Sequence, residues 1–498
     1  MNSEFASRLR GRSRMIEPLL DHGLPYSRLV KSSASMSWMP MDTLCTHCRK
    51  LCGHTSCVNA LTFSTDGQFL ASGGDDCVVY LWDFHQDDLN RPMCSFTGPH
   101  GNIFNLAFSV RKQYLLSGGT DKSIFRFDVA TGTQLDAGSS GSASSIYQDH
   151  NDCIRGLTCH SQHEELFLSA SDDGSIRMHD GRGNGLSRAQ ATLQESVEVT
   201  DVRFHPTLEH NFISTDSRGG VHLRDMRMAF GPSTQRTNGG IVQSYNTTLS
   251  KRGSRRLGMP EPSSVAFNRE GDMLAVTLLN HLPTLYSLHE SQPIATFSGL
   301  LLPDGSPVPS NQRTYCNTCT IKHGSFGSMG FETDGFYSAG SDDFRGYIWK
   351  VPNIAHLVNQ RRQIGEREWD SQRSPPEIAF VESETNDRYI PLELSQPYCR
   401  LTGHDSIVNT TLFHPYLPHI LTSGIENHIT LHSPTPASPC SSSLQLRPPD
   451  VRTLPRGAIE GGLMTNDLSE RETIGLFDQI LRAEAGASLF DNSDDSNT

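Results

Sequence analysis

Residues 53–83 read GHTSCVNALTFSTDGQFLASGGDDCVVYLWD, and this stretch decides the fold of the chain. It opens with Gly-His and continues into an alternating strand, VNALTF, a turn, STDGQ, and a second strand, FLASGG. A tight Asp-Asp turn then leads to a third strand, CVVYLW, which closes on Asp83. Apolar residues in period-2 alternation, with turns every few residues, predict a small antiparallel sheet. One such sheet cannot bury both of its faces, so several must stack.

Further copies of this unit follow along the chain, at residues 100–128, 150–180, 199–225, 263–287, 336–350 and 403–433. The unit resembles the WD repeat, which opens with Gly-His, closes with Trp-Asp and forms one blade of a β-propeller. Seven copies imply seven blades. We therefore expect an all-β protein, a seven-bladed WD-repeat β-propeller over residues 45–435, with a short helical N-terminal extension and a disordered C-terminal tail that contains one helix.

The resemblance also implies structural polar residues in the blades. These are the opening histidines, the turn aspartates and the residues that close the third strand: His54, His100, His150, His404, Asp76, Asp121, Asp173, Asp343, Trp82, Asp83, Asp128 and Trp349. Histidine and turn aspartate hold the turn by buried hydrogen bonds, whose loss leaves unsatisfied groups. Arg218 in repeat four and Asn427 in repeat seven stand at the aspartate position, so those two blades should be less rigid.

Bulk composition excludes several classes of protein. The 498 residues carry a formal net charge of −13, so the molecule as a whole is not a nucleic-acid-binding body. No apolar run reaches the length of a membrane span, and the first residues lack the apolar core of a signal peptide. The twelve cysteines should therefore be reduced thiols of a cytoplasmic or nuclear protein that is not secreted.

Segments outside the repeats predict extensions and insertions. Residues 1–44 form either short helices, which would add to docking on a partner, or a disordered tail. The basic run at 251–256 is either a solvated loop or a nuclear-import signal. The remaining segments are insertions at 231–262, 300–318 and 352–398, a disordered Pro/Ser linker at 436–467, an amphipathic helix at 468–486 that docks on the propeller or on a partner, and an acidic tail at 487–498.

Two cysteine clusters have the residue types of a zinc site. One combines Cys45, Cys48 and Cys52 with His54, and the other combines Cys316, Cys319 and His323. His54 already belongs to a repeat, both clusters overlap propeller strands, and free cysteines are more common, so we expect neither a metal nor a cofactor. The chain has no P-loop, no Gly-x-Ser-x-Gly elbow and no kinase motifs, so we expect no enzyme.

Asp-x-Arg occurs at the end of the third strand in two neighbouring repeats. Asp180-Gly181-Arg182 and Asp225-Met226-Arg227 lie 45 residues apart, so both turns belong on one rim of the disc. Other repeats end differently, for example in Asp83-Phe84-His85 and Asp128-Val129-Ala130. If the fold required this arginine, every blade would carry it, so the restriction favours a partner site. Local salt bridges or coincidence are the alternative.

The doublet resembles the Trp-Asp-x-Arg motif of the cullin-4-associated substrate receptors. The segments CNTCTIKHGSFGS, SAGSDDFRGYIWKVP and GLFDQILRAEAG resemble the type 5 members of that family in particular. The resemblance implies that Asp180, Arg182, Asp225 and Arg227 bind the ligase adaptor, the large subunit of the damage-specific DNA-binding protein. It further implies recruitment of a protein substrate, with ubiquitin transfer by other subunits. His179 and Arg224 stand where the motif has tryptophan. A general scaffold or a chromatin-associated propeller is the alternative.

Overall fold

The computed structural model describes residues 45–448, together with residues 475–477 and 479. Short internal gaps fall at residues 87–88, 90, 134–139, 183–188, 233–236, 311, 330–332, 372–375, 383–384 and 435–444. The expected N-terminal extension at 1–44, the acidic tail and most of the Pro/Ser linker lie outside the described residues.

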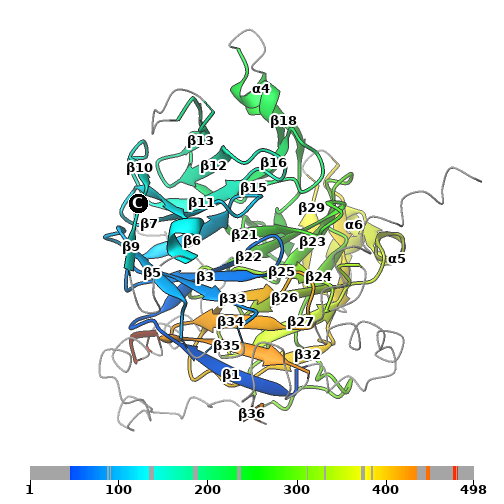
Figure 1. The fold of residues 1–498 in the computed structure, drawn as a ribbon. Coiled ribbons are helices and arrows are strands. Elements are labelled where there is room, and N and C mark those ends of the chain that lie inside the picture. The colour runs from blue at the N-terminus through cyan, green and yellow to red at the C-terminus, as the bar shows by residue number, and fades with distance from the viewer. Residues whose placement is uncertain are drawn as a thin grey trace, which may run out of the picture.

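Blades one to three follow the expected repeats as antiparallel sheets (Figure 1). Blade one contains β2 (Val58–Phe63), β3 (Phe69–Gly74), β4 (Val79–Asp83) and β5 (Cys94–Thr97), with β9 (Ser140–Ser142) parallel to β5. Blade two contains β6 (Ile103–Phe108), β7 (Tyr114–Gly119), β8 (Ile124–Asp128) and β10 (Ser145–Tyr147). Blade three contains β11 (Ile154–Cys159), β12 (Leu166–Ser171), β13 (Ser175–Asp180) and β14 (Ala191–Gln194). A short helix, α3 (Val129–Thr133), follows β8.

Blades four to six continue the array with the same strand order. Blade four contains β15 (Val199–Phe204), β16 (Asn211–Asp216), β17 (Val221–Asp225) and β18 (Ile241–Ser244), with α4 (Met226–Phe230) and a 3-10 turn, η3 (Asn238–Gly240), before β18. Blade five contains β21 (Pro262–Phe267), β22 (Met273–Leu278), β23 (Thr284–Ser287) and β24 (Ala295–Phe297), with β31 (Leu392–Leu394) parallel to β24. Blade six contains β25 (Ser325–Gly327), β26 (Phe336–Gly340), β27 (Gly346–Lys350) and β32 (Cys399–Leu401).

Blade seven joins the two ends of the propeller. Its inner strands β33 (Val408–Phe413), β34 (Ile420–Gly424) and β35 (His428–Ser433) come from the last repeat. Its outer strand is β1 (His47–Cys52), which pairs antiparallel with β35 along its whole length. A two-residue strand, β36 (Gln445–Leu446), pairs with β1, although it falls in the segment that we expected to be disordered. The chain thus closes the ring by pairing its first strand with its last repeat.

An eighth sheet, among the residues described, lies outside the seven blades. Its strands come from the insertions at 231–262 and 352–398: β19 (Leu249–Lys251), β20 (Leu257–Gly258), β28 (Arg362–Ile364), β29 (Ile378–Val381) and β30 (Arg388–Ile390). Two short helices, α5 (Ile354–Gln360) and α6 (Glu366–Ser371), belong to the same region. The basic run at 251–256 therefore begins in a strand and continues into a hairpin turn, and it is not simply a solvated loop.

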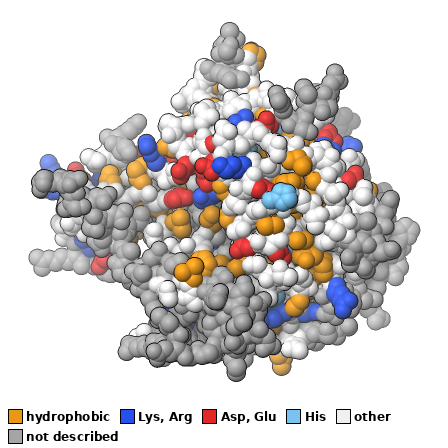
Figure 2. All heavy atoms as spheres, turned by 90° about the vertical axis from the view of Figure 1, so that its left-hand side faces the viewer, with side chains coloured by type: hydrophobic (Ala, Val, Ile, Leu, Met, Phe, Trp, Pro, Cys, Tyr) orange, Lys and Arg blue, Asp and Glu red, His pale blue; other side chains and the backbone are white. Residues whose placement is uncertain are grey.

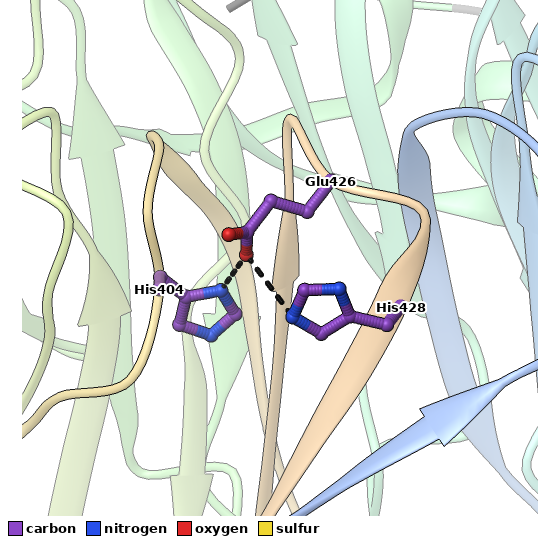
Figure 3. Close-up of side chains that lie close together, drawn as sticks. All are labelled: His404, Glu426 and His428. Carbon is purple, nitrogen blue, oxygen red and sulfur yellow. Dashed lines mark hydrogen bonds and ion pairs between the residues drawn. The ribbon is translucent and has the colours of Figure 1, made fainter. Parts of the chain in front are cut away.

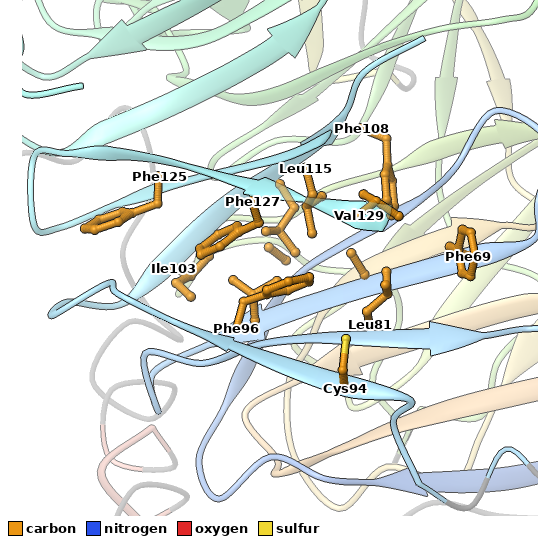
Figure 4. Close-up of a cluster of buried hydrophobic side chains, with 14 residues drawn as sticks. Phe69, Leu81, Cys94, Phe96, Ile103, Phe108, Leu115, Phe125, Phe127 and Val129 are labelled. Atoms are coloured by element: carbon orange, nitrogen blue, oxygen red, sulfur yellow. The ribbon is translucent and has the colours of Figure 1, made fainter. Parts of the chain in front are cut away.

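Apolar side chains between neighbouring blades stabilise the ring. Phe96 of blade one stacks on Phe127 of blade two at 5.0 Å between ring centroids, inside a buried cluster drawn in Figure 4. Equivalent clusters lie between all successive blades, including one between blades seven and one that contains Leu421 and Trp82. Each fully buried large side chain contributes about 1.5–3 kcal/mol. A single blade cannot bury both of its faces alone, and these clusters bury them against the neighbouring blades.

The antiparallel strands give the disc two distinct faces. A central channel of about 350 Å³, lined by residues of the innermost strands, lies between them. The turns that follow the first and third strands form one face, here called the Asp-x-Arg face, which includes residues 160–166, 180–182, 205–211 and 225–227. The turns between the second and third strands form the opposite face, which includes residues 75–78, 172–174 and 426–428.

Candidate functional site

The two Asp-x-Arg turns have nearly the same geometry. In blade three, Asp180 accepts hydrogen bonds from the backbone N–H of Arg182 at 3.0 Å and from its Nη2 at 2.5 Å. In blade four, Asp225 accepts the corresponding bonds from the backbone N–H of Arg227 at 2.8 Å and from its Nη2 at 2.6 Å. Nε of each arginine donates to the same carboxylate, so each guanidinium is fixed by its own aspartate.

Both arginines project into solvent while both aspartates are mostly covered. The side chains of Arg182 and Arg227 are 59% and 66% exposed, against 20% for Asp180 and 12% for Asp225. The hydrogen bond from each arginine is the main reason why the pKa of its aspartate lies below the ordinary range. Each turn therefore presents an ordered guanidinium with further N–H donors free to meet a carboxylate or an aromatic ring of a partner.

A chain of contacts links the two turns across the Asp-x-Arg face. The backbone N–H of Gly181 donates to Glu165 O at 2.9 Å, within the turn that precedes β12. His163 of that turn contacts Glu209 of the equivalent turn in blade four at 3.0 Å. The backbone N–H of Met226 then donates to His210 O at 2.7 Å. The Asp-x-Arg turns are thus held on one continuous stretch of the face.

The aspartate has a backbone role that other blades share, but the arginine does not. Asp83 accepts a hydrogen bond from His85 N–H at 3.1 Å, and Asp128 accepts one from Thr131 N–H at 2.7 Å. Neither turn has an arginine two residues after the aspartate. Aspartate at this position therefore caps the turn, and the arginine is an addition found in blades three and four.

Blades one and three contain complete histidine–serine networks. In blade one, His54 Nδ1 lies 2.9 Å from Asp76 Oδ2, and its Nε2 lies 2.8 Å from Ser72 Oγ, which also accepts a hydrogen bond from Trp82 Nε1 at 2.9 Å. Blade three repeats this arrangement with His150, Ser169, Asp173 and His179. Burial raises the pKa of Asp173, but the hydrogen bonds from His150 and from backbone N–H groups lower it by more. The pKa of Asp173 therefore lies below its usual value.

The interpretation of blade seven was wrong at the acidic position. Glu426, not Asn427, is equivalent to Asp76, because Gly424 pairs with Val408 as Gly74 pairs with Val58. His404 Nδ1 contacts Glu426 directly, while its Nε2 lies 2.6 Å from Thr422 Oγ1. The separation between His404 and Glu426 is 22 residues, as it is between His54 and Asp76. That spacing, with glutamate accepted for aspartate, is the sequence signal that would have identified the residue.

His100 in blade two was also placed wrongly. Its side chain is exposed, and only its backbone N–H donates to Asp121, at 3.2 Å. The same bond in blade one comes from Thr55, the residue after His54, so the residue before His100, Pro99, occupies the histidine position. Ser117 Oγ is therefore left without a hydrogen-bond partner among the described residues. Proline has no ring N–H with which to replace the imidazole.

Blade six holds its turn differently again. Asp343 is buried and accepts hydrogen bonds from Tyr347 Oη at 2.6 Å and Arg345 Nη1 at 3.0 Å, with no histidine among its recorded partners. Trp349 Nε1 donates to Ser298 O in the neighbouring blade at 2.7 Å, because Ala339 stands where blade one has Ser72. Sequence reasoning also missed Lys322, which forms a fully buried ion pair with Asp342 beside this turn.

His179 and Arg224 fill the tryptophan position in blades three and four. His179 stacks on Phe167 at 4.4 Å between ring centroids, and its Nε2 lies 3.1 Å from Ser169 Oγ. Arg224 Nε donates to Ser214 Oγ at 2.7 Å. Its Nη1 donates to Gly239 O at 2.7 Å, and its Nη2 pairs with Glu195 at 2.8 Å. Both residues point into the blade and not toward the Asp-x-Arg face.

In neither cysteine cluster do three potential ligand atoms gather. Across the part of the chain that the structure describes, the group of three or more donor side chains that does gather is His404, Glu426 and His428, which the sequence analysis did not consider. Cys48 and Cys52 lie in β1, and burial raises the pKa of Cys48. Cys45 is buried against Cys399. In the second cluster, burial raises the pKa of Cys316 and lowers that of His323.

The opposite face combines apolar and acidic groups. Phe477 of the C-terminal helical segment packs against a cluster of Cys57, Phe344, Ile407 and Ile425. Figure 2 looks at the side of the molecule on which this segment lies, and shows acidic side chains gathered near its middle, with hydrophobic side chains beside them. A hollow of about 300 Å³ between blades three and four is lined there by acidic side chains and Arg218.

Comparison with known proteins agrees with this architecture. The family model described as "WD domain, G-beta repeat" matches residues 45–83, 90–128 and 141–180. Together with the seven stacked sheets, these matches show a β-propeller fold with WD repeats in its first three blades.

Among curated proteins, the chain is similar to "DDB1- and CUL4-associated factor 5" of Mus musculus and of Homo sapiens, at 28% identity over 402 residues in both cases. The aligned region is 80% of this chain but 35% of either relative, so the chain spans about a third of their length. It is also 34% identical over 139 residues to "WD repeat protein iqw1" of Schizosaccharomyces pombe, which covers 27% of this chain and 17% of that protein. The resemblance to type 5 cullin-4-associated factors, first seen in short motifs, is thereby confirmed as a similarity that extends over most of the chain.

No helix in the described part of the chain is long and apolar enough to cross a membrane.

Proposed function

We propose that this protein is a non-catalytic substrate receptor of a cullin-4 RING ubiquitin ligase. It binds the ligase adaptor, the large subunit of the damage-specific DNA-binding protein, through Arg182 and Arg227. It recruits a protein substrate elsewhere on the propeller, and other subunits transfer the ubiquitin. This activity belongs in the cytoplasm or the nucleus.

One observation carries the proposal: two neighbouring blades present the same ordered guanidinium on one face. Each arginine is fixed by its own aspartate and is more than half exposed. The other turns of this kind for which a cap is described, at Asp83 and Asp128, keep the aspartate without the arginine. Arginine is enriched at the energetic centres of protein interfaces because it offers several donors and a planar face. The name of the type 5 relatives, which are associated with DDB1 and CUL4, supports the same partner.

The opposite face supports a separate place for the substrate. It lies at the far ends of the strands from Arg182 and Arg227, so a substrate there leaves the adaptor contacts free. Its acidic hollow near Glu198 suits a segment with basic side chains. A receptor needs two such independent surfaces.

Pull-down with purified adaptor tests the proposal. Wild type is compared with the double variant Arg182→Ala/Arg227→Ala. We expect the double variant to bind the adaptor at least about tenfold more weakly, because exposed arginines at an interface centre dominate its affinity.

Arg218→Ala is the matched control, since Arg218 is an exposed arginine of blade four on the opposite face. It should retain wild-type affinity. If the double variant binds as well as wild type, the turns are not the docking site. If wild type does not bind the adaptor at all, the protein is a scaffold or chromatin-associated propeller and not a ligase receptor.

A further inference from the structure

Three buried side chains of blade seven converge at the turn between its second and third strands. His404, Glu426 and His428 each contribute one nitrogen or oxygen atom to a group in which all atoms lie within 4.8 Å of one another (Figure 3). His404 Nδ1 contacts Glu426 Oε2 directly, and His428 Nε2 lies 3.4 Å from the same oxygen. Two imidazoles and one carboxylate are a common protein ligand set for zinc.

His428 is the unexplained member of this group. His404 and Glu426 are the histidine and the acid of the blade network. Blades one and three build this network without an imidazole at the position of His428. The equivalent residues are Val78 in blade one, Ser175 in blade three and Arg345 in blade six. Ser175 and Arg345 both donate hydrogen bonds to the acid of their blade, at 2.5 Å and 3.0 Å.

His428 makes no such bond. It is 6% exposed, and its Nε2 has no hydrogen-bond partner in the described structure, although it is aimed at the Glu426 carboxylate. A buried, unpartnered nitrogen costs stability unless something meets it.

We infer that His404 Nδ1, Glu426 Oε2 and His428 Nε2 bind one zinc ion, with water in the fourth position. This site is independent of the proposed ligase function. It differs from the cysteine clusters of the sequence analysis, because none of its three protein ligands is a thiolate.

The geometry around His404 must adjust to hold the metal. Zinc–ligand bonds of about 2.0–2.1 Å in a tetrahedron separate the ligand atoms by about 3.3 Å. The 3.4 Å between His428 and Glu426 already fits that separation. His404 Nδ1 and Glu426 are in direct hydrogen-bond contact, so zinc binding requires the proton between them to leave Nδ1, while the neutral ring keeps one proton on Nε2.

Neighbouring groups already orient the ligands. Nε2 of His404 lies 2.6 Å from Thr422 Oγ1, a hydroxyl that can accept the ring proton when Nδ1 faces a metal. The second oxygen of Glu426 accepts the backbone N–H of Asp405 at 2.7 Å. Such outer contacts fix the orientation of metal ligands and raise affinity.

The position of the site suggests what zinc would do. His428 begins β35 and pairs directly with Cys52, the last residue of β1. Zinc would therefore tie the opening loop and the central turn of blade seven together next to the strand that closes the ring. A ligand that binds the folded ring but not the unfolded chain stabilises the folded ring by mass action.

Zinc titration of the full chain, first stripped with a chelator, tests this inference. A chromophoric zinc chelator serves as competitor. We expect one equivalent bound with a Kd below about 1 µM, and a rise in Tm on adding zinc. His428→Ser restores the residue of blade three, so the network should fold, yet zinc affinity should fall by about 100-fold and the rise in Tm should disappear.

His222→Ser is the matched control, because His222 also faces a carboxylate, Asp216, at 3.7 Å but lies in blade four. It should bind zinc as wild type does. Cobalt substitution should give a tetrahedral visible spectrum without a thiolate charge-transfer band. Absence of zinc binding by wild type, equal affinity in His428→Ser, or a thiolate band would each overturn the inference.

Discussion

Blades three and four are neighbours that agree on the surface and differ inside. Both end the third strand in Asp-x-Arg with hydrogen-bond lengths that match to within a few tenths of an ångström. Inside, blade three contains a histidine–serine–histidine network around Ser169, whereas Arg224 of blade four reaches Ser214, a backbone carbonyl and Glu195.

The difference separates what the fold needs from what the surface offers. The polar group at the tryptophan position contacts the serine hydroxyl of its blade, and an imidazole, a guanidinium or an indole can make this contact. The fold does not impose arginine after the closing aspartate, because Asp83 and Asp128 cap their turns without it. Agreement at an exposed position that the fold leaves open is the reason to assign that position to a partner.

The largest difference between the two blades should appear on removing Arg224. Arg224→Met keeps the length of the side chain but leaves Ser214 Oγ and Gly239 O without their donor and Glu195 without its cation. We expect the free energy of unfolding to fall by about 2–4 kcal/mol, since Arg224 is 2% exposed. Chemical denaturation measures this. Arg218→Met, at an exposed position of the same blade, should change it by less than about 0.5 kcal/mol, and an equal loss in both variants would contradict the buried role.

The sequence was sufficient for the architecture because the blade pattern is local. Alternating strands, Gly-His openings and Asp turns recur at fixed spacing, and each predicts one sheet. Ring closure by β1 could not be predicted in this way, since the pairing of His47–Cys52 with β35 joins residues almost 400 positions apart. The eighth sheet could not be predicted either, because its strands come from two insertions that lie outside the repeat pattern.

Acid should weaken blade three more than blade four. Burial lowers the pKa of His179 to about 3 in the folded state, against about 6.5 in an unfolded chain. Between these values the unfolded state binds the additional proton, so stability falls as pH falls, by up to about 1.4 kcal/mol per pH unit. Arg224 does not titrate in this window. His160 and His205 occupy equivalent turns and both have lowered pKa values, so their contributions offset in the comparison.

Hydrogen exchange at pH 7 and pH 5.5, corrected for intrinsic rates, measures this difference through peptides that cover β12–β13 and β16–β17. We expect protection to fall in the first pair and to hold in the second. His179→Phe should remove the difference between the blades. The pKa of Asp173 lies below its ordinary value, so its contribution is lost only below about pH 4, outside the experiment. Equal loss of protection in both blades would contradict the assignment to His179.

His179→Phe itself should cost about 1 kcal/mol or less at pH 7. A phenyl ring retains the stacking on Phe167, and Ser169 Oγ keeps its contact with His150 at 2.7 Å. The substitution also removes Nδ1 of His179, which makes no hydrogen bond in the described structure. Thermal unfolding at pH 7 measures the effect. A loss as large as that in Arg224→Met would mean that the two residues are equally necessary, and the contrast between the blades would disappear.

The candidate site shows where reading a repeat by eye fails. Arg182 and Arg227 could be placed on one face from the repeat register alone, because the register fixes which end of a strand a residue occupies. Glu426 was missed because the turn of blade seven was counted from Asn427, and His100 was misassigned because Pro99 shifts the opening loop by one residue. One-residue errors of this kind move a side chain from the buried network to the surface, which only the hydrogen bonds themselves reveal.

The smallest effect is expected where blades three and four agree. Arg182→Ala/Arg227→Ala removes two exposed ion pairs in which each guanidinium contacts an aspartate two residues away. The aspartates keep their bonds to the backbone N–H groups of residues 182 and 227, so both turns retain their caps. Exposed ion pairs contribute little to folding, and we expect Tm to change by less than about 2 °C. Differential scanning calorimetry measures this on the same preparation used for the adaptor pull-down.

An unchanged Tm together with lost binding assigns the arginines to the partner. A large drop in Tm would instead make them part of the fold, and the agreement between the two blades would then need no partner to explain it.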